Sequence, residues 1–290
     1  MKSSSARGPH LQELGEFLRT RRSEVQPADV GLPGGSSQRR VEGLRREEAA
    51  ALALISTDYY TRIEQGRVPP SAPVLEALAS ALGLDDDQVD YLNELRENAR
   101  RPDAQRQSGG PAARGRAAPR PQLARLLRQL TETPAIVLGP RTDILAWNRL
   151  AARLYVDFDA LPTHQLNYVR LIFTDPEMRS RFADWASVAR ACVAILRREA
   201  AATPDDPALS KLVGELTIAD PQFAHWWSAR GVERQDFGTK VIIHPEVGEI
   251  TLEWDIFRYA GAPEQQLVIN SVDDDSPSRE RLERLRDDPA

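Results

Sequence analysis

The sequence predicts a two-domain chain: an all-α domain of five short helices, then an α+β domain with a five-stranded antiparallel sheet and inserted helices. Three observations predict it. Helical periodicity runs through the first hundred residues, residues 101–120 lack large apolar side chains, and period-two alternation recurs after residue 134. We therefore expect domains at 1–100 and 121–290, joined by a flexible basic linker at 101–120.

Five segments of the first domain carry helical signals. Leucines recur at helical spacing in LQELGEFLRTRR, and a Gly-, Pro- and Ser-rich loop follows. Ser56 is a good N-cap, and Gly66 followed by two prolines ends the helix that Ser56 begins. The expected helices are 11–22, 45–53, 56–65, 71–82 and one that starts at Asp85.

The second domain alternates helices and strands. PQLARLLRQLTET predicts a helix, AIVLGPRTDILAWN predicts two short strands around a Gly-Pro turn, and Asn148 is placed to cap a helix that runs through Tyr155. We expect one long helix over 175–201, then two helices separated at Asp220-Pro221. The segments KVIIHPEVGEITLEWDIFRY and QQLVINSV predict three strands, and SRERLERLRDDPA predicts a frayed surface helix.

The short helix at 56–65 has two different sides. Ile55, Tyr60 and Ile63 have the spacing of a buried side, whereas the other side is polar. Together with 45–53 and a tight turn, it forms the helix-turn-helix pattern, whose second helix enters the DNA major groove. On the polar side, Arg62 could donate to guanine, and Asp58 could accept from cytosine.

The net charge of the chain is −5, and this net acidity argues against indiscriminate binding of nucleic acid. Arginines nevertheless cluster around this helix pair. Arg46 is placed for phosphate contact, because it lies at the start of the first helix of the pair. The candidate DNA-contacting residues are Arg39, Arg40, Arg45, Arg46, Ser56, Thr57, Asp58, Tyr59, Thr61, Arg62 and Arg67. Two alternatives stay open: the polar side could be a solvated corner of a bundle, and Arg62 could pair with Asp58. Glu64 is expected to fix a neighbouring loop.

The composition excludes several classes of protein. No run of 18 apolar residues predicts a membrane span, and the single Cys192 lies in the apolar run ACVAIL, which suits a core position in a reducing compartment. Neither a GxGxxG motif, a P-loop nor a GxSxG motif is present, and the four histidines lack metal-ligand spacing. We therefore expect a cytoplasmic, nucleoid-associated protein that is no enzyme and holds no cofactor or metal.

All five tryptophans belong to the second domain, where they could line an apolar pocket. Arg170 and His244 could face an acidic head group. The candidate pocket residues are Trp147, Arg170, Phe173, Phe182, Trp185, Trp226 and His244. The alternative is that the aromatic residues are ordinary core and that His244 is a hydrogen-bonded residue at a strand end.

The segment GLRREEAAALALISTDYYTRIEQGR resembles the phage-repressor-like (XRE) helix-turn-helix family, and most of all its MmyB-like regulators. PAIVLGPRTDILAWN, NYVRLIFTDPEMRSRFADW, VGELTIADPQFAHWW and HPEVGEITL resemble successive blocks of the MmyB-like ligand-binding domain. The resemblance implies a phage-repressor-like DNA-binding domain and a PAS-like sensor whose pocket suits fatty-acid-like molecules. Leu54 is a departure, because the family usually has glycine in the tight turn, and a left-handed leucine costs roughly 1 kcal/mol or more.

These observations predict a sequence-specific transcription regulator. It would bind double-stranded DNA at a palindromic operator as a homodimer, and a small apolar, fatty-acid-like ligand would bias that binding. The alternative hypothesis is a protein-interaction module that docks a partner enzyme or a sigma-type factor without direct recognition of DNA.

Overall fold

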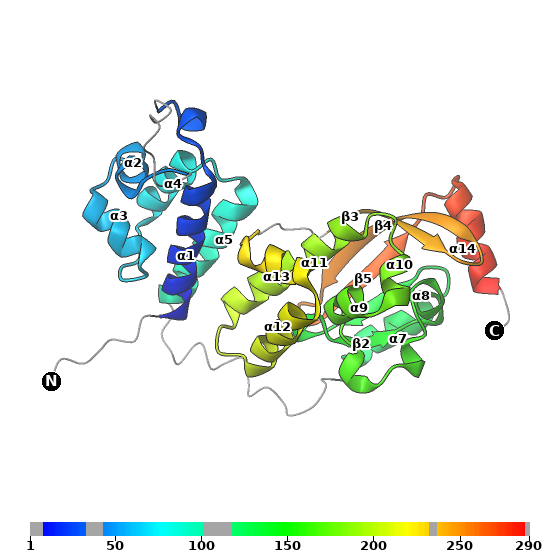
Figure 1. The fold of residues 1–290 in the computed structure, drawn as a ribbon. Helices are drawn as coiled ribbons and strands as arrows, with labels where there is room; N and C mark the ends of the chain where they lie inside the picture. Colours follow the sequence, from blue (N-terminus) through cyan, green and yellow to red (C-terminus); the bar gives the residue numbers. More distant parts are fainter. Residues whose placement is uncertain (1–7, 33–42, 101–117, 232–236, 288–290) are drawn as a thin grey trace. The chain divides into compact units, whose positions relative to one another are not determined.

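A computed structural model of the chain describes residues 8–32, 43–100, 118–231 and 237–287 (Figure 1). The chain divides into two compact units. The first comprises Met1–Gly110 with Arg197–Asp206, and the second comprises Pro111–Leu196 with Pro207–Ala290. The predicted linker at 101–120 lies outside the described residues up to residue 117, as do Arg39 and Arg40.

The first unit contains the five predicted helices among its described residues. Their bounds are α1 Pro9–Glu24, α2 Arg46–Leu52, α3 Thr57–Glu64, α4 Ala72–Ala81 and α5 Asp86–Arg100, with a 3-10 turn, η1, at Pro27–Val30. The apolar positions that predicted the helices form the core, because Leu14, Phe17 and Leu18 of α1 are fully buried together with Leu92 and Leu95 of α5.

The second unit is built on the predicted five-stranded sheet, whose strand order is β2-β1-β5-β4-β3 and whose pairs are all antiparallel. The strands are β1 Ala135–Leu138, β2 Ile144–Trp147, β3 Phe237–His244, β4 Gly248–Arg258 and β5 Gln266–Ser271. Between β2 and β3 the chain inserts its helices, as predicted. They are α8 Arg149–Leu154, α9 Tyr168–Thr174, α10 Pro176–Ser180, α11 Trp185–Ala202, α12 Pro207–Ala219 and α13 Pro221–Ser228, with 3-10 turns η3 Phe158–Ala160 and η4 Thr163–Gln165. A further 3-10 turn, η2 Pro140–Thr142, joins β1 to β2.

The two faces of this sheet are covered differently. Helix α7 (Pro121–Gln129) buries Leu123 and Leu127 against one face, where they meet Val137 of β1 and Leu267 of β5. Because side chains alternate along a strand, the intervening residues of β1 and β5 point to the opposite face. That opposite face meets residues of α9 and α11, and a cavity lies between them.

The long helix predicted over 175–201 is wrong as a single element, because the chain interrupts it between α10 and α11. Residues 181–183 pair with β3 instead. The N–H of Ala183 donates to the carbonyl of Val241, the N–H of Ile243 donates to the carbonyl of Arg181 at 2.7 Å, and Phe182 lies opposite Ile242. These bonds to a strand more than 50 residues away replace the helical bonds that local periodicity predicts.

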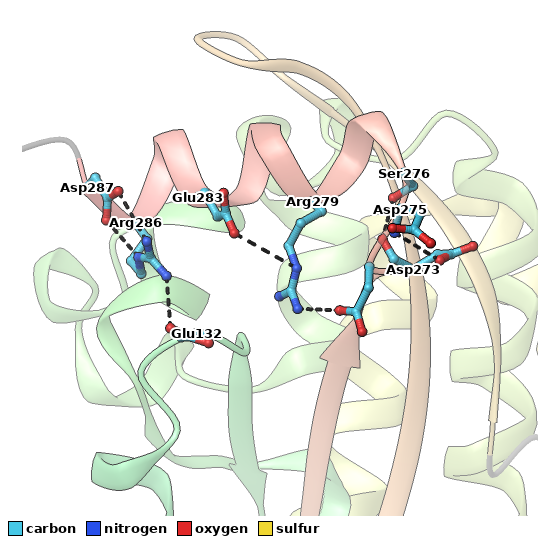
Figure 2. A network of polar contacts seen from close by, with 9 residues as sticks. Glu132, Asp273, Asp275, Ser276, Arg279, Glu283, Arg286 and Asp287 are labelled. Atoms are coloured by element: carbon cyan, nitrogen blue, oxygen red, sulfur yellow. Dashed lines mark hydrogen bonds and ion pairs between the residues drawn. The ribbon is translucent and has the colours of Figure 1, made fainter.

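The last helix, α14 (Pro277–Asp287), is predicted by the sequence, but the expectation that it is frayed is wrong. It buries Leu282 and Leu285, and charged groups hold it at both ends (Figure 2). Arg279 contacts Asp274 in the turn before the helix, and Arg286 near the end pairs with Glu132 at 3.2 Å. The helix is thus fixed on the sheet by apolar and ionic contacts together.

Candidate nucleic-acid interface and ligand cavity

Local signals fix both ends of helix α3. The Ser56 hydroxyl accepts a hydrogen bond from the Tyr59 backbone N–H at 3.2 Å, which satisfies one of the first-turn donors that a helix leaves unpaired. At the other end Gly66 adopts φ +64°, and its N–H donates to the carbonyl of Ile63 at 2.8 Å. The helix therefore starts and stops where the sequence predicted.

The turn between α2 and α3 places Leu54 in the left-handed region, at φ 55°. The N–H of Leu54 donates to Ala51 at 3.1 Å and the N–H of Ile55 donates to Ala50 at 2.9 Å, which is the paired closure of a Schellman motif. Leu54 thus occupies the position where glycine is usual, and its side chain is 93% exposed. The backbone accepts the strain, and the tight turn that defines a helix-turn-helix forms.

The inward side of α3 rests on α1. Tyr60 and Ile63 are fully buried, as their spacing predicted, whereas Ile55, at the turn before the helix, is only partly buried. A Cβ atom at Gly15 of α1 would lie 2.4 Å from the carbonyl oxygen of Glu64, so the two backbones touch there and only glycine fits. This close approach fixes the depth at which α3 sits on its scaffold.

A buried carboxylate ties α1, α2 and α3 together. Glu64 accepts from Arg22 Nη2 at 2.8 Å and from Arg46 Nε at 2.6 Å, and its side chain is 1% exposed. Arg22 also donates to the carbonyl of Leu44 at 2.6 Å, in the segment before α2. Glu64 therefore fixes a neighbouring loop, as expected. The hydrogen bond and the charge of Glu64 raise the pKa of Arg46. The Arg46 guanidinium is therefore fixed in place by Glu64, although its side chain is partly exposed.

The outward side of α3 is polar and accessible. Ser56, Thr57, Asp58 and Arg62 are exposed, and Tyr59 is partly exposed. The Thr61 hydroxyl donates to the carbonyl of Thr57 at 2.7 Å, so this group is used within the helix. Arg45 and Arg67 flank the helix pair and are exposed. Within the described ranges no ion pair joins Arg62 to Asp58, so neither side chain is occupied by the other.

One cavity of the second unit lies between the sheet and helices α9 and α11, and its volume is about 180 Å³. Alternate residues of β1, β3, β4 and β5 line one side, including Ile136, Trp254 and Val268, and helix residues such as Val169 and Val188 line the other. The lining is mainly apolar. A cavity of this character binds apolar molecules, because transfer of apolar surface out of water is favourable.

Of the described residues in this lining, Lys240 of β3 carries the one side chain that is ordinarily charged. Its Nζ lies 5.3 Å from the centroid of the Tyr155 ring and 5.9 Å from that of Trp254. Burial lowers the pKa of Lys240 from 10.5 to about 7, and the nearby Cys192 thiol offsets a small part of that shift. Burial likewise raises the pKa of Cys192 to about 12, so this thiol is inert at neutral pH.

Family models match both units. A helix-turn-helix domain model matches residues 13–92, which contain α2, α3 and the Leu54 turn. A model described as the MmyB-like transcription regulator ligand binding domain matches residues 119–285, more than half of the chain. The chain belongs to the MmyB-like transcription regulators. It therefore combines a DNA-binding domain with a ligand-binding domain. A comparison with curated proteins finds no match.

In this MmyB-like regulator, none of the seven predicted pocket residues lines the cavity between the sheet and α11, whereas Trp147 lines two other pockets of this unit and Arg170 lines a third. Phe173, Trp185 and Trp226 instead pack on one another and on Phe223, with ring centroids 5.1 to 6.2 Å apart, and form a separate aromatic cluster. Each of the three lies on a different helix, α9, α11 or α13, so the sequence marks each ring as apolar but does not say which neighbour it contacts.

The other four candidates have partners of their own. Trp147 packs on Phe158. Phe182 pairs with β3. Arg170 forms an ion pair with Glu215 at 2.5 Å, and His244 Nε2 lies 3.0 Å from the carbonyl of Arg153. His244 is thus the hydrogen-bonded strand-end histidine of the alternative interpretation.

Lys240 is the functional candidate that the sequence predictions missed. A signal for it exists in FGTKVIIH, where Lys240 occupies the same alternating positions as Ile242 and His244, both of which are buried. A lysine at an inward position of a strand breaks the binary pattern, and such departures mark functional sites.

In the part of the chain that the structure describes, no helix has the length and apolar character needed to cross a membrane. The same residues contain no group of His, Cys, Asp and Glu arranged to hold a metal ion.

Proposed function

We propose that this regulator recognises a specific DNA sequence by inserting α3 into the major groove. The observation that carries this proposal is the two-sided character of α3: one side is fixed by the Gly15 contact and the Glu64 ion pairs, and the other carries exposed hydrogen-bonding groups. A reading helix needs both properties, because it must hold its position while its side chains reach base edges.

Residue roles follow from position. Arg62, exposed near the end of α3, donates to guanine O6 and N7, Asp58 accepts from cytosine N4, and Thr57 contacts a thymine methyl group. Arg45, Arg46 and Arg67 contact phosphates at the margins, with Arg46 also serving the fold through Glu64. The regulator acts as a homodimer on a palindromic operator, whose half-sites lie about one helical turn apart.

The test compares Arg62→Ala with Arg45→Ala in DNA binding. The probe is DNA from upstream of the regulator's own gene, first footprinted and then titrated across a salt series. Arg62→Ala is expected to cost roughly 1–3 kcal/mol on the footprinted sequence and to relax discrimination at one base pair. Arg45→Ala is expected to weaken specific and random DNA alike and to lower the salt slope by about one. Equal effects of the two variants on both DNAs would contradict these roles.

We further propose that the ligand is a small, fatty-acid-like molecule bound in the cavity beneath the sheet. The support is the mainly apolar lining between the sheet and α11 together with the Lys240 amine. The volume, about 180 Å³, slightly exceeds that of engineered cavities of about 150 Å³ that hold benzene, so a short alkyl chain fits. Native mass spectrometry of the purified protein, followed by extraction, tests this. A protein that releases no such molecule and binds no alkyl compound would remove the ligand proposal and leave the DNA proposal intact.

A further inference from the structure

Lys240 stands at a position that the fold otherwise gives to apolar residues. In the β3–β4 pair it lies opposite Leu252, while Ile242 lies opposite Ile250, and all three of these neighbours are fully buried. Its other inward neighbour, Gly238, lies opposite Trp254 and leaves space for that indole, since a Cβ there would be 3.1 Å from the indole nitrogen. The amine therefore projects into the cavity from an apolar wall.

The amine has aromatic neighbours but no counter-ion among the described residues. The titratable groups that share the cavity lining with it are Tyr155, Tyr168 and Cys192, and burial raises the pKa of each, so all three are neutral at pH 7. The Tyr155 hydroxyl is already used, because it donates to Asn270 Oδ1 at 2.9 Å. No aspartate or glutamate of the described chain lines this cavity.

An ammonium in such a place is costly, because the attraction of two ring faces replaces only part of its hydration. The same cost makes the position selective. An anion that enters the cavity regains a charge-assisted hydrogen bond in a water-poor setting, where that bond is stronger than in bulk water. A neutral molecule of the same shape gains only the burial of its apolar chain.

We propose that the Lys240 amine is the polar end of the ligand site and that it binds the carboxylate of an acid whose alkyl chain lies along the apolar wall. This inference rests on the proposed ligand function of the cavity and adds to it the residue and the charge that select the ligand. Lys240 is thus a specificity-determining residue within the ligand-binding domain.

Proton uptake follows from this assignment. Because the pKa of Lys240 lies at about 7, the amine is largely neutral at pH 8, and pairing with a carboxylate restores its proton. Binding is therefore expected to take up close to one proton per ligand at pH 8, and the affinity for the acid is expected to fall about tenfold for each pH unit above that pKa.

The experiment uses the full-length chain, with octanoate and 1-octanol as probes that share a chain but differ in head group. Isothermal titration in two buffers of different ionisation enthalpy gives both affinity and proton uptake. Lys240→Met keeps the length of the side chain and removes the amine. Lys211→Met is the matched control, because Lys211 is the other described lysine and its side chain is 76% exposed on α12. Thermal melts check that each variant is folded.

For the wild type and for Lys211→Met we expect octanoate to bind with proton uptake at pH 8. For Lys240→Met we expect octanoate affinity to fall roughly tenfold to a hundredfold, proton uptake to vanish and 1-octanol to bind as before. Unchanged octanoate affinity and proton uptake in folded Lys240→Met, with 1-octanol still bound, would overturn the role of Lys240 and leave the cavity as a ligand site. Failure of every protein to bind either probe would overturn both proposals.

Discussion

Replacing Leu54 by glycine is expected to stabilise the DNA-binding unit. A left-handed residue with a Cβ costs roughly 1–2 kcal/mol, and Leu54 is held at φ 55° by the closure of α2. Its side chain is 93% exposed, so truncation removes almost no buried surface. Glycine gives back part of the gain, about 0.4–1 kcal/mol, because it adds conformational freedom to the unfolded chain. The net effect is a gain of roughly 0.5–1 kcal/mol.

Hydrogen exchange of the full chain measures this gain where it arises. All five tryptophans belong to the second unit, so fluorescence does not follow the first. In peptides that cover α2 and α3, a gain of roughly 0.5–1 kcal/mol slows exchange about two- to fivefold if these helices open with the whole unit. Leu54→Ala is the control, because it shortens the side chain but keeps the Cβ strain, and it is expected to stay near wild type.

The converse substitution, Gly66→Ala, strengthens the comparison. Gly66 has φ +64°, and a Cβ there would lie 2.9 Å from the carbonyl oxygen of Leu11, so the substitution is expected to destabilise the unit by more than 1 kcal/mol. If Leu54→Gly exchanged as fast as Leu54→Ala, or faster than wild type, backbone strain at Leu54 would not be the quantity that limits this turn.

Three further outcomes are expected. Glu64→Gln should destabilise the first unit by roughly 3–5 kcal/mol in urea unfolding followed by circular dichroism, because Arg22 loses its buried counter-charge. The control is Glu76→Gln at an exposed position, which should change the stability little. An equally small change for Glu64→Gln would show that the ion-pair network is dispensable. The stability of the second unit should rise between pH 7 and about 9, because over this range Lys240 binds more protons in the unfolded state than in the folded state. Above pH 9 the raised pKa of Cys192 acts in the opposite direction. Lys240→Met should flatten the rise, as measured by unfolding followed through tryptophan fluorescence. Asp220→Ala should cost about 1 kcal/mol by the same assay, because this side chain caps α13 through two backbone N–H groups; an unchanged midpoint would refute the cap's contribution.

The sequence predicts this fold well where the signals are local. Caps at Ser56 and Asn148 accept from the first turns of α3 and α8, as the sequence indicated, and the predicted break at Asp220-Pro221 separates α12 from α13. The alternation along β4 and the turns around it gave the antiparallel sheet. Each of these signals lies within a few residues of its effect, so it is legible in a single sequence.

Predictions failed where distant residues decide. The interruption after α10 depends on bonds from Arg181 and Ala183 to β3, which no local pattern announces. Aromatic spacing correctly marked apolar helix faces in the second unit, but the packing of helix on helix drew those rings away from the cavity. The amine at Lys240 became visible only when the strand register showed which face it occupies.

The pairing of residues 181–183 with β3 bears on whether the edge of the sheet can pair with another chain. Strand β3 is an outermost strand, and an outermost strand with free N–H and C=O groups invites pairing with another chain and aggregation. Residues 181–183 pair with residues 241–243 of β3, in the second half of that strand, while β2 at the opposite margin is only four residues long. The interrupted helix thus protects the protein from edge-to-edge self-association, and a variant that restored a continuous helix there would expose β3 and promote it.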